Sequence, residues 1–182
     1  TVDFGGQIGV QETYYIPHPE TRTMPKSLGA KRVDVHGCFP PHAMRLAKAM
    51  LESGLYGEQD VEIKGIKSTP FDIMYDLLLE VPESKETPVW AYGLVVDVFG
   101  AKDGQDTKIR FWTEHPPQDE WGGQAAYYKN IAIPLSIGAI MIAQGEVPVR
   151  GIVPPETAYN PGRFFEELAK RGIAVKQEVS KL

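Results

Sequence analysis

The chain has 182 residues, of which 42% are hydrophobic and 24% charged, which is typical of a globular protein with its own hydrophobic core. Its formal net charge of −5 argues against a nucleic-acid partner. No run of about 18 apolar residues is present, so no membrane span is expected. A single cysteine, Cys38, excludes an internal disulfide framework and predicts a cytoplasmic, reducing location, with Cys38 itself a small buried packing group.

Two strands separated by a stiff polar loop are expected near the start of the chain. Aromatic and β-branched residues favour a strand over 10–18, and alternating valines predict another over 30–37. The prolines of segment 17–25 fix the backbone and suppress helix formation, so its polar side chains should lie on an extended loop.

Four helices are predicted from their start and stop signals, which are proline or a polar cap at the start and, for three of them, glycine at the end. They begin near Pro41, Pro70, Pro134 and Pro161. The helix from Pro134 is apolar nearly all round, which predicts that it is buried, and the preceding segment 124–133 fits either a strand or a helix.

Further strands are predicted over 60–64, 89–99, 107–115 and 173–179. Asp103-Gly104, between two of these segments, is a strong hairpin signal. Hairpin strands segregated from helices predict an α+β fold with a largely antiparallel mixed sheet and helices packed on it. Neither a repeat nor a break in composition divides the chain, so we expect a single domain over 1–182.

The sequence carries no recognisable nucleotide-binding motif. The spacing G-x-G-x-x-G, which holds a dinucleotide pyrophosphate at a helix N-terminus, occurs nowhere, and the P-loop and G-x-S-x-G patterns are also absent. The chain also opens at Thr1 inside a glycine-rich segment. We therefore expect an excised piece of a longer protein, without a nucleotide-binding segment of its own.

The polar segment after Pro17 holds the densest cluster of chemically able groups. His18 and Glu20 are suited to proton transfer near neutral pH, and Arg22 is suited to binding a carboxylate bidentately. A solvated proline-rich loop explains the same residues equally well. No metal site is expected, because the other histidines add no ligand spacing.

Four segments together resemble a known family. They are Pro-His-Pro-Glu-Thr-Arg-Thr-Met-Pro at 17–25, Gly-Cys-Phe-Pro-Pro at 37–41, Arg-Gly-Ile-Val-Pro-Pro-Glu at 150–156, and Phe-Phe-Glu-Glu-Leu-Ala-Lys-Arg-Gly-Ile at 164–173. In order and spacing they are similar to the C-terminal part of the saccharopine dehydrogenase and lysine dehydrogenase family, over nearly the whole chain.

The resemblance implies an N-terminal Rossmann domain for NAD or NADP, absent from this chain, and a second domain resembling the catalytic domain of glyceraldehyde-3-phosphate dehydrogenase. This second domain binds the amino-acid substrate and often builds a homodimer, so the chain alone is expected to be inactive. The implied reaction is reversible hydride transfer between the nicotinamide and a C–N bond of a saccharopine- or lysine-like amino acid, through an imine.

A zwitterionic substrate requires cationic donors, aromatic walls and a group that takes the amine proton. For this chain the resemblance implies that the proton-transfer and substrate-binding roles fall to the polar side chains of the first loop, with tyrosines as walls and a further cation nearby. The candidates are His18 and Glu20 as catalytic residues, and Tyr15, Thr21, Arg22, Arg32, Tyr128 and Lys129 as substrate-binding residues.

One stretch departs from the family. Many relatives carry a Thr-Gly or Ser-Gly pair shortly before the apolar helix, whereas this chain has Asn130-Ile131-Ala132-Ile133 there. The departure leaves open a non-catalytic ligand-binding or dimerisation module that retains the family fold. A self-contained hydrolase or isomerase using His18 and Glu20 would need a second base or a metal.

Overall fold

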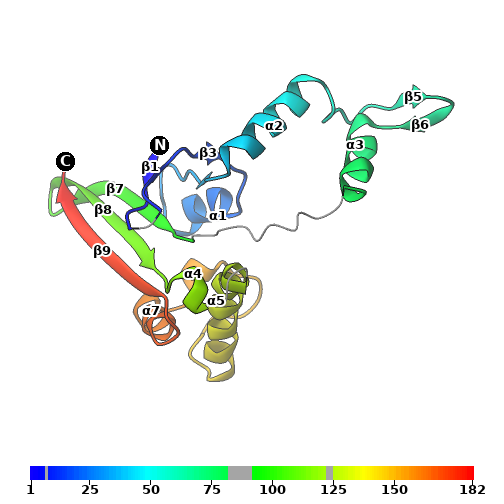
Figure 1. The fold of residues 1–182 in the computed structure, drawn as a ribbon. Helices are drawn as coiled ribbons and strands as arrows, with labels where there is room; N and C mark the ends of the chain where they lie inside the picture. Colours follow the sequence, from blue (N-terminus) through cyan, green and yellow to red (C-terminus); the bar gives the residue numbers. More distant parts are fainter. Residues whose placement is uncertain (7, 82–91, 122–124) are drawn as a thin grey trace. The chain divides into compact units, whose positions relative to one another are not determined.

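A computed structural model describes residues 1–6, 8–81, 92–121 and 125–182 of the chain (Figure 1). The chain divides into two compact units, one formed by Thr1–Gly37 with Pro88–Leu182 and the other by Cys38–Thr87. Helices and antiparallel sheets occur together, so the predicted α+β class is confirmed. The strands form four small sheets, and every strand pair among the described residues is antiparallel, so the expected single mixed sheet is wrong.

The N-terminal part of the first unit contains short strand pairs. β1 (Val2–Asp3) pairs with β2 (Val10–Gln11), and β3 (Tyr14–Tyr15) pairs with β4 (His36–Gly37). The expected strands are therefore present only in part. Alternating valines alone are insufficient, because a strand also needs a neighbour to accept its backbone hydrogen bonds.

The expectation of an extended loop over 17–25 is wrong, because this segment leads into helix α1 (Glu20–Ser27). Pro17 and Pro19 lie before the first turn, where a missing N–H group removes no helical hydrogen bond. Only Pro25 lies inside the helix. The prolines therefore determine where α1 begins instead of preventing it.

A three-stranded sheet in the order β7-β8-β9 forms the largest strand assembly of the first unit. β7 (Val95–Lys102) and β8 (Gln105–Glu114) form a hairpin, and β9 (Ala174–Lys181) pairs with the other edge of β8. Asp103 and Gly104 both have positive φ angles, 53° and 76°, as a two-residue type I′ turn requires. The hairpin prediction is confirmed, although β7 begins at Val95 and not at the expected residue 89; residues 89–91 lie outside the described part of the chain.

One face of this sheet is apolar. The strand register places Val96 beside Phe111, and Val98 beside Ile109, which in turn lies beside Val179. The three edge-strand valines are 47–53% exposed. This apolar face is therefore open over much of its area.

Helices α4 (Gln118–Trp121), α5 (Ala125–Ala143), α6 (Pro155–Ala158) and α7 (Pro161–Ala169) complete the first unit. Asn160 begins α7 as predicted, because its side chain accepts a hydrogen bond from the backbone N of Arg163 at 3.1 Å. α7 packs against α5 and β9 (Figure 1). The buried core at this junction consists of Trp121, Ile137, Met141, Leu168 and Ile173.

α5 begins nine residues before Pro134, so the ambiguous segment is helical and Pro134 lies inside the helix. The prediction that this helix is buried all round is wrong. Ile137 and Met141 are each 1% exposed, whereas Leu135 on another side of the helix is 72% exposed. No helix in the described part of the chain is both long and apolar enough to cross a membrane.

The second unit contains α2 (Pro41–Glu52), the hairpin β5 (Val61–Ile63) and β6 (Ile66–Ser68), and α3 (Pro70–Leu79). The predicted helix starts are confirmed, and Thr69 caps α3 by accepting a hydrogen bond from the backbone N of Asp72 at 3.0 Å.

An apolar pocket of about 240 Å³ in the second unit is lined by side chains that follow α2, belong to α3 or follow α3, namely Leu55, Ile73, Met74, Leu77, Leu78 and Val81. Cys38 is exposed, which corrects the expectation of a buried thiol.

Candidate functional site

The start of α1 brings together three of the predicted site residues. The carbonyl oxygen of His18 accepts hydrogen bonds from the hydroxyl of Thr21 (2.7 Å) and from its backbone N (3.2 Å), which forms the first turn. His18 Nδ1 contacts the carboxylate of Glu20. A carboxylate that accepts the Nδ1 proton leaves Nε2 free to take a proton, so this pair is suited to act as a general base.

The guanidinium of Arg22 lies one turn further along α1. Its side chain is exposed, and it forms no ion pair or hydrogen bond with another residue of the described part of the chain. An exposed guanidinium keeps its planar set of donors for a bidentate carboxylate contact. We call His18, Glu20, Thr21 and Arg22 the α1 cluster.

The far end of α1 is tied to α6. The hydroxyl of Ser27 donates to the carboxylate of Glu156 at 2.6 Å, across 129 positions of sequence. This hydrogen bond from Ser27 holds the pKa of Glu156 below its ordinary value. An eight-residue helix with an internal proline is weak by itself, so this contact helps to fix α1 in place. It also joins α1, which begins within segment 17–25, to Glu156 of segment 150–156, and both segments resemble the family.

A second cluster lies around the phenol of Tyr15. Arg32 Nη2 donates to Tyr15 Oη at 3.3 Å, and Arg32 Nε pairs with Asp34 Oδ2 at 2.6 Å, so that Asp34 raises the pKa of Arg32. The Tyr15 ring packs on His36 with 4.1 Å between ring centroids, and Thr13 Oγ1 lies 3.3 Å from His36 Nδ1. The pairing of β3 with β4 produces this arrangement, because it places Tyr15 opposite His36.

A third cluster consists mainly of rings. His115, directly after β8, has Tyr92 at 5.4 Å and Trp121 at 5.6 Å between ring centroids. Tyr127 lies 6.3 Å from Tyr92, and Tyr128 is the neighbour of Tyr127 at 5.8 Å. We call these five residues the ring cluster.

Lys129 adds a positive charge to the ring cluster. Its Nζ donates to the carbonyl oxygen of Trp121 at 2.6 Å and lies 5.5 Å from the centroid of the Trp121 ring. An ammonium group has three donors, so Lys129 retains others for a ligand.

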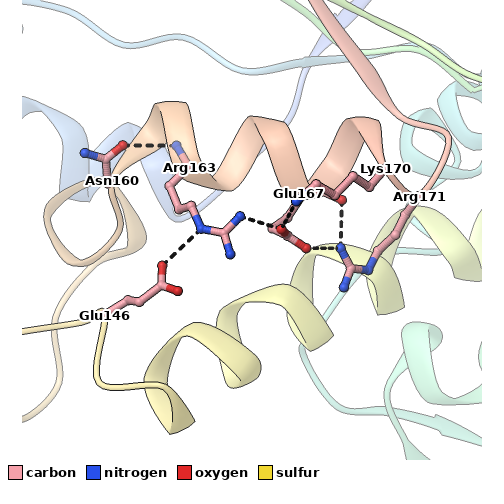
Figure 2. A network of polar contacts seen from close by, with 6 residues as sticks. All are labelled: Glu146, Asn160, Arg163, Glu167, Lys170 and Arg171. Atoms are coloured by element: carbon pink, nitrogen blue, oxygen red, sulfur yellow. Dashed lines mark hydrogen bonds and ion pairs between the residues drawn. The ribbon is translucent and has the colours of Figure 1, made fainter.

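A dense ionic network lies on α7, and Figure 2 shows its members. The carboxylate of Glu167 accepts hydrogen bonds from Lys170 (2.7 Å), from Arg171 and from Arg163. Arg163 also pairs with Glu146 at 3.3 Å. These three cations lower the pKa of Glu167 from 4.5 to about 2. Because their charges are directed at Glu167, the network is suited to holding the end of α7 rather than to binding a ligand.

A sequence model of the family described as the saccharopine dehydrogenase C-terminal domain matches residues 3–173. The chain belongs to this family. The match includes all four segments and all three clusters and ends just before β9, so the resemblance recognised in the four segments is confirmed.

The structure groups the predicted site residues of this saccharopine dehydrogenase C-terminal domain only in part. It joins His18, Glu20 and Thr21, with Arg22 on the same helix, and it joins Tyr15 to Arg32. Tyr128 and Lys129 belong to the ring cluster instead. The assignments of these residues to a substrate stay predictions.

Sequence reasoning missed His36, His115 and Glu156. A pairing of two short strands brings His36 to Tyr15, and a tertiary contact brings Glu156 to Ser27. Neither contact leaves a local sequence signal. His115 had one, since it is the last residue of a predicted strand and directly precedes Pro116-Pro117.

Proposed function

We propose that this chain is the substrate-side domain of an NAD(P)-dependent oxidoreductase that acts on a C–N bond of a saccharopine- or lysine-like amino acid. The observation that carries the proposal is the family match over residues 3–173. Both compact units would belong to one substrate-binding domain with a fold resembling the catalytic domain of glyceraldehyde-3-phosphate dehydrogenase. The chain alone would be inactive.

The residues of the chain itself suit the binding of a zwitterion. Arg22 would bind a carboxylate, and the pair His18 and Glu20 would take the proton that the amine loses as the imine forms. Tyr15 and Tyr128 would wall the ligand, with Arg32 or Lys129 adding positive charge. Thr21 would act through the turn that it forms with His18.

The nicotinamide, when bound, supplies hydride acceptance and donation. The residues of this chain do not fit the dinucleotide itself, because the sequence has no G-x-G-x-x-G segment to hold a pyrophosphate at a helix N-terminus. We therefore assign cofactor binding mainly to a separate Rossmann domain, and we derive no catalytic step from contacts between this chain and the nucleotide.

Ligand-induced stabilisation tests the proposal. Lysine, saccharopine, glutamate and 2-oxoglutarate are each added to the chain alone. NADH and NADPH are added alone as separate comparisons. An amino acid at a hundredfold excess over its Kd is expected to stabilise the fold by about 2.7 kcal/mol, seen as a rise in melting temperature. A strong rise with a nucleotide alone would contradict the division of roles between domains.

We also propose a homodimer, as the family resemblance implies. The open apolar face of the β7-β8-β9 sheet supports it, because Val96, Val98 and Val179 are half exposed there. Val98→Lys is expected to convert a dimer into a monomer in sedimentation velocity, whereas Ala101→Lys, exposed on the opposite face of β7, should not. A wild-type chain that is monomeric at micromolar concentration would contradict the proposed homodimer.

A non-catalytic module is the second candidate. In this chain the stretch that carries a hydroxyl and glycine in many relatives lies within α5, where Asn130 is 9% exposed. A buried amide there favours a structural role over ligand contact. Binding of an amino acid without turnover, after the cofactor domain is supplied, would favour this candidate.

A further inference from the structure

His115 is the polar residue whose surroundings the proposed roles leave unexplained. It follows directly after β8 and is half buried between the rings of Tyr92 and Trp121. This position places a titratable ring inside an apolar, aromatic environment. Among the described residues, its Nδ1 is the one side-chain nitrogen or oxygen that is shielded from solvent without a hydrogen-bond partner.

The hydrogen bonds around Thr113 favour one tautomer of the His115 ring. Leu94 and Thr113 bond to each other, since Thr113 N donates to Leu94 O at 3.0 Å and Leu94 N donates to Thr113 Oγ1 at 3.0 Å. His115 Nε2 lies 2.8 Å from the same hydroxyl oxygen. The hydroxyl already accepts from Leu94 N, and donating its own proton to Nε2 gives it both an acceptor and a donor. The neutral ring then carries its proton on Nδ1.

Burial lowers the pKa of His115, so the ring is neutral at pH 7 and presents a single N–H group at Nδ1. A shielded N–H group without an acceptor costs the folded state the desolvation of that group. Native proteins compensate such groups with a water molecule, an ion or a ligand. In this tautomer the missing partner of His115 is an acceptor.

The neighbours of the ring indicate which kind of acceptor fits. Lys129 lies against the same Trp121 ring as His115 does, at 5.5 Å from its centroid, and its ammonium favours an anionic group. Tyr127 extends the aromatic wall through Tyr92. A carboxylate attached to an aliphatic chain matches this combination of one neutral donor, one cation and apolar rings.

We propose that His115 donates its Nδ1–H to a carboxylate oxygen of the amino-acid ligand, with Lys129 as the accompanying cation. The contact rests on the proposed function and deepens it, because it places one end of the substrate at the ring cluster. Because Nδ1 is covered in the structure, neighbouring side chains must move aside as the ligand enters, and shielding from water then strengthens the hydrogen bond.

Two variants of different length test the contact in the full chain. Asparagine brings its amide to the position of Nδ1, whereas glutamine brings it to the position of Nε2. His115→Asn is expected to bind glutamate or lysine, whichever binds the wild type, within about threefold of wild-type affinity. His115→Gln is expected to lose roughly tenfold or more, the effect of a lost hydrogen bond to a charged group. Circular dichroism melts confirm that both variants fold.

Imidazole ¹⁵N spectra of the wild-type chain give a second readout that a merely structural histidine would not move. They should show Nδ1 protonated in the free chain, with its proton signal moving downfield when glutamate or lysine is added. Equal affinities for the two variants and an unmoved Nδ1 signal, in a chain that does bind the ligand, would overturn the role of His115 alone. A wild-type chain that binds neither glutamate, lysine, saccharopine nor 2-oxoglutarate would overturn both this contact and the proposed function.

Discussion

Replacing Ile137 with alanine is expected to lower the free energy of unfolding by about 2–5 kcal/mol. Ile137 is 1% exposed and packs in the core with Met141, Leu168 and Ile173, where α5, α7 and the start of β9 meet. Removal of its side chain leaves a cavity that a close-packed core fills only in part. Urea denaturation followed by circular dichroism measures the loss.

Ile142→Ala provides the matched control, because Ile142 lies on the same helix but is 58% exposed. Its expected effect is within about 0.5 kcal/mol. Equal destabilisation by the two substitutions would contradict the burial of α5 on one face only.

Replacing Glu167 with glutamine is expected to lower stability at neutral pH and to flatten the dependence of stability on acid. In the wild type the pKa of Glu167 is about 2, below its ordinary value of 4.5, because Lys170, Arg171 and Arg163 bond to the carboxylate. A lowered pKa means that the folded state binds the proton less readily than the unfolded state. The stabilisation is therefore complete above pH 4.5, declines from there to pH 2 and is lost below.

Melting temperatures of the wild type and Glu167→Gln, measured between pH 7 and pH 2, test this dependence. The difference between them should shrink as the pH falls from 4.5 towards 2. Glu166→Gln is the control, because Glu166 is exposed and takes no part in the network. A difference in melting temperature that stays constant across this pH range would show that the charge of Glu167 does not stabilise the fold.

Helices with strong start signals could be predicted from the sequence. Thr69 before Pro70 and Asn160 before Pro161 each cap a helix through their own side chain, so the cause lies within three residues of the effect. The Asp103-Gly104 turn is local in the same way. Local causes can be read from sequence because no distant partner changes them.

Features that depend on distant partners could not be predicted in this way. α1 forms in spite of Pro25, with its end tied to Glu156 by Ser27. Composition alone does not show that only one face of α5 finds partners, which is why Ile137 is buried and Leu135 is exposed.

The residues of the candidate site show the same difference between local and distant causes. His18, Glu20 and Arg22 were found because chemically able residues stand close together in sequence. The ring cluster was missed because it collects Tyr92, His115 and Trp121 from three separate segments. His115 can be recognised as a candidate site residue only when its neighbours in space are known.

The first unit is discontinuous in sequence, and this has a consequence for folding during synthesis. α1 is complete near residue 27, but its anchor Glu156 is translated more than a hundred residues later. β8 likewise cannot pair with β9 until residues 174–181 have been synthesised. On the ribosome the N-terminal segment therefore stays without its partners until almost the whole chain has emerged. The second unit, Cys38–Thr87, is continuous and has all of its residues available much earlier.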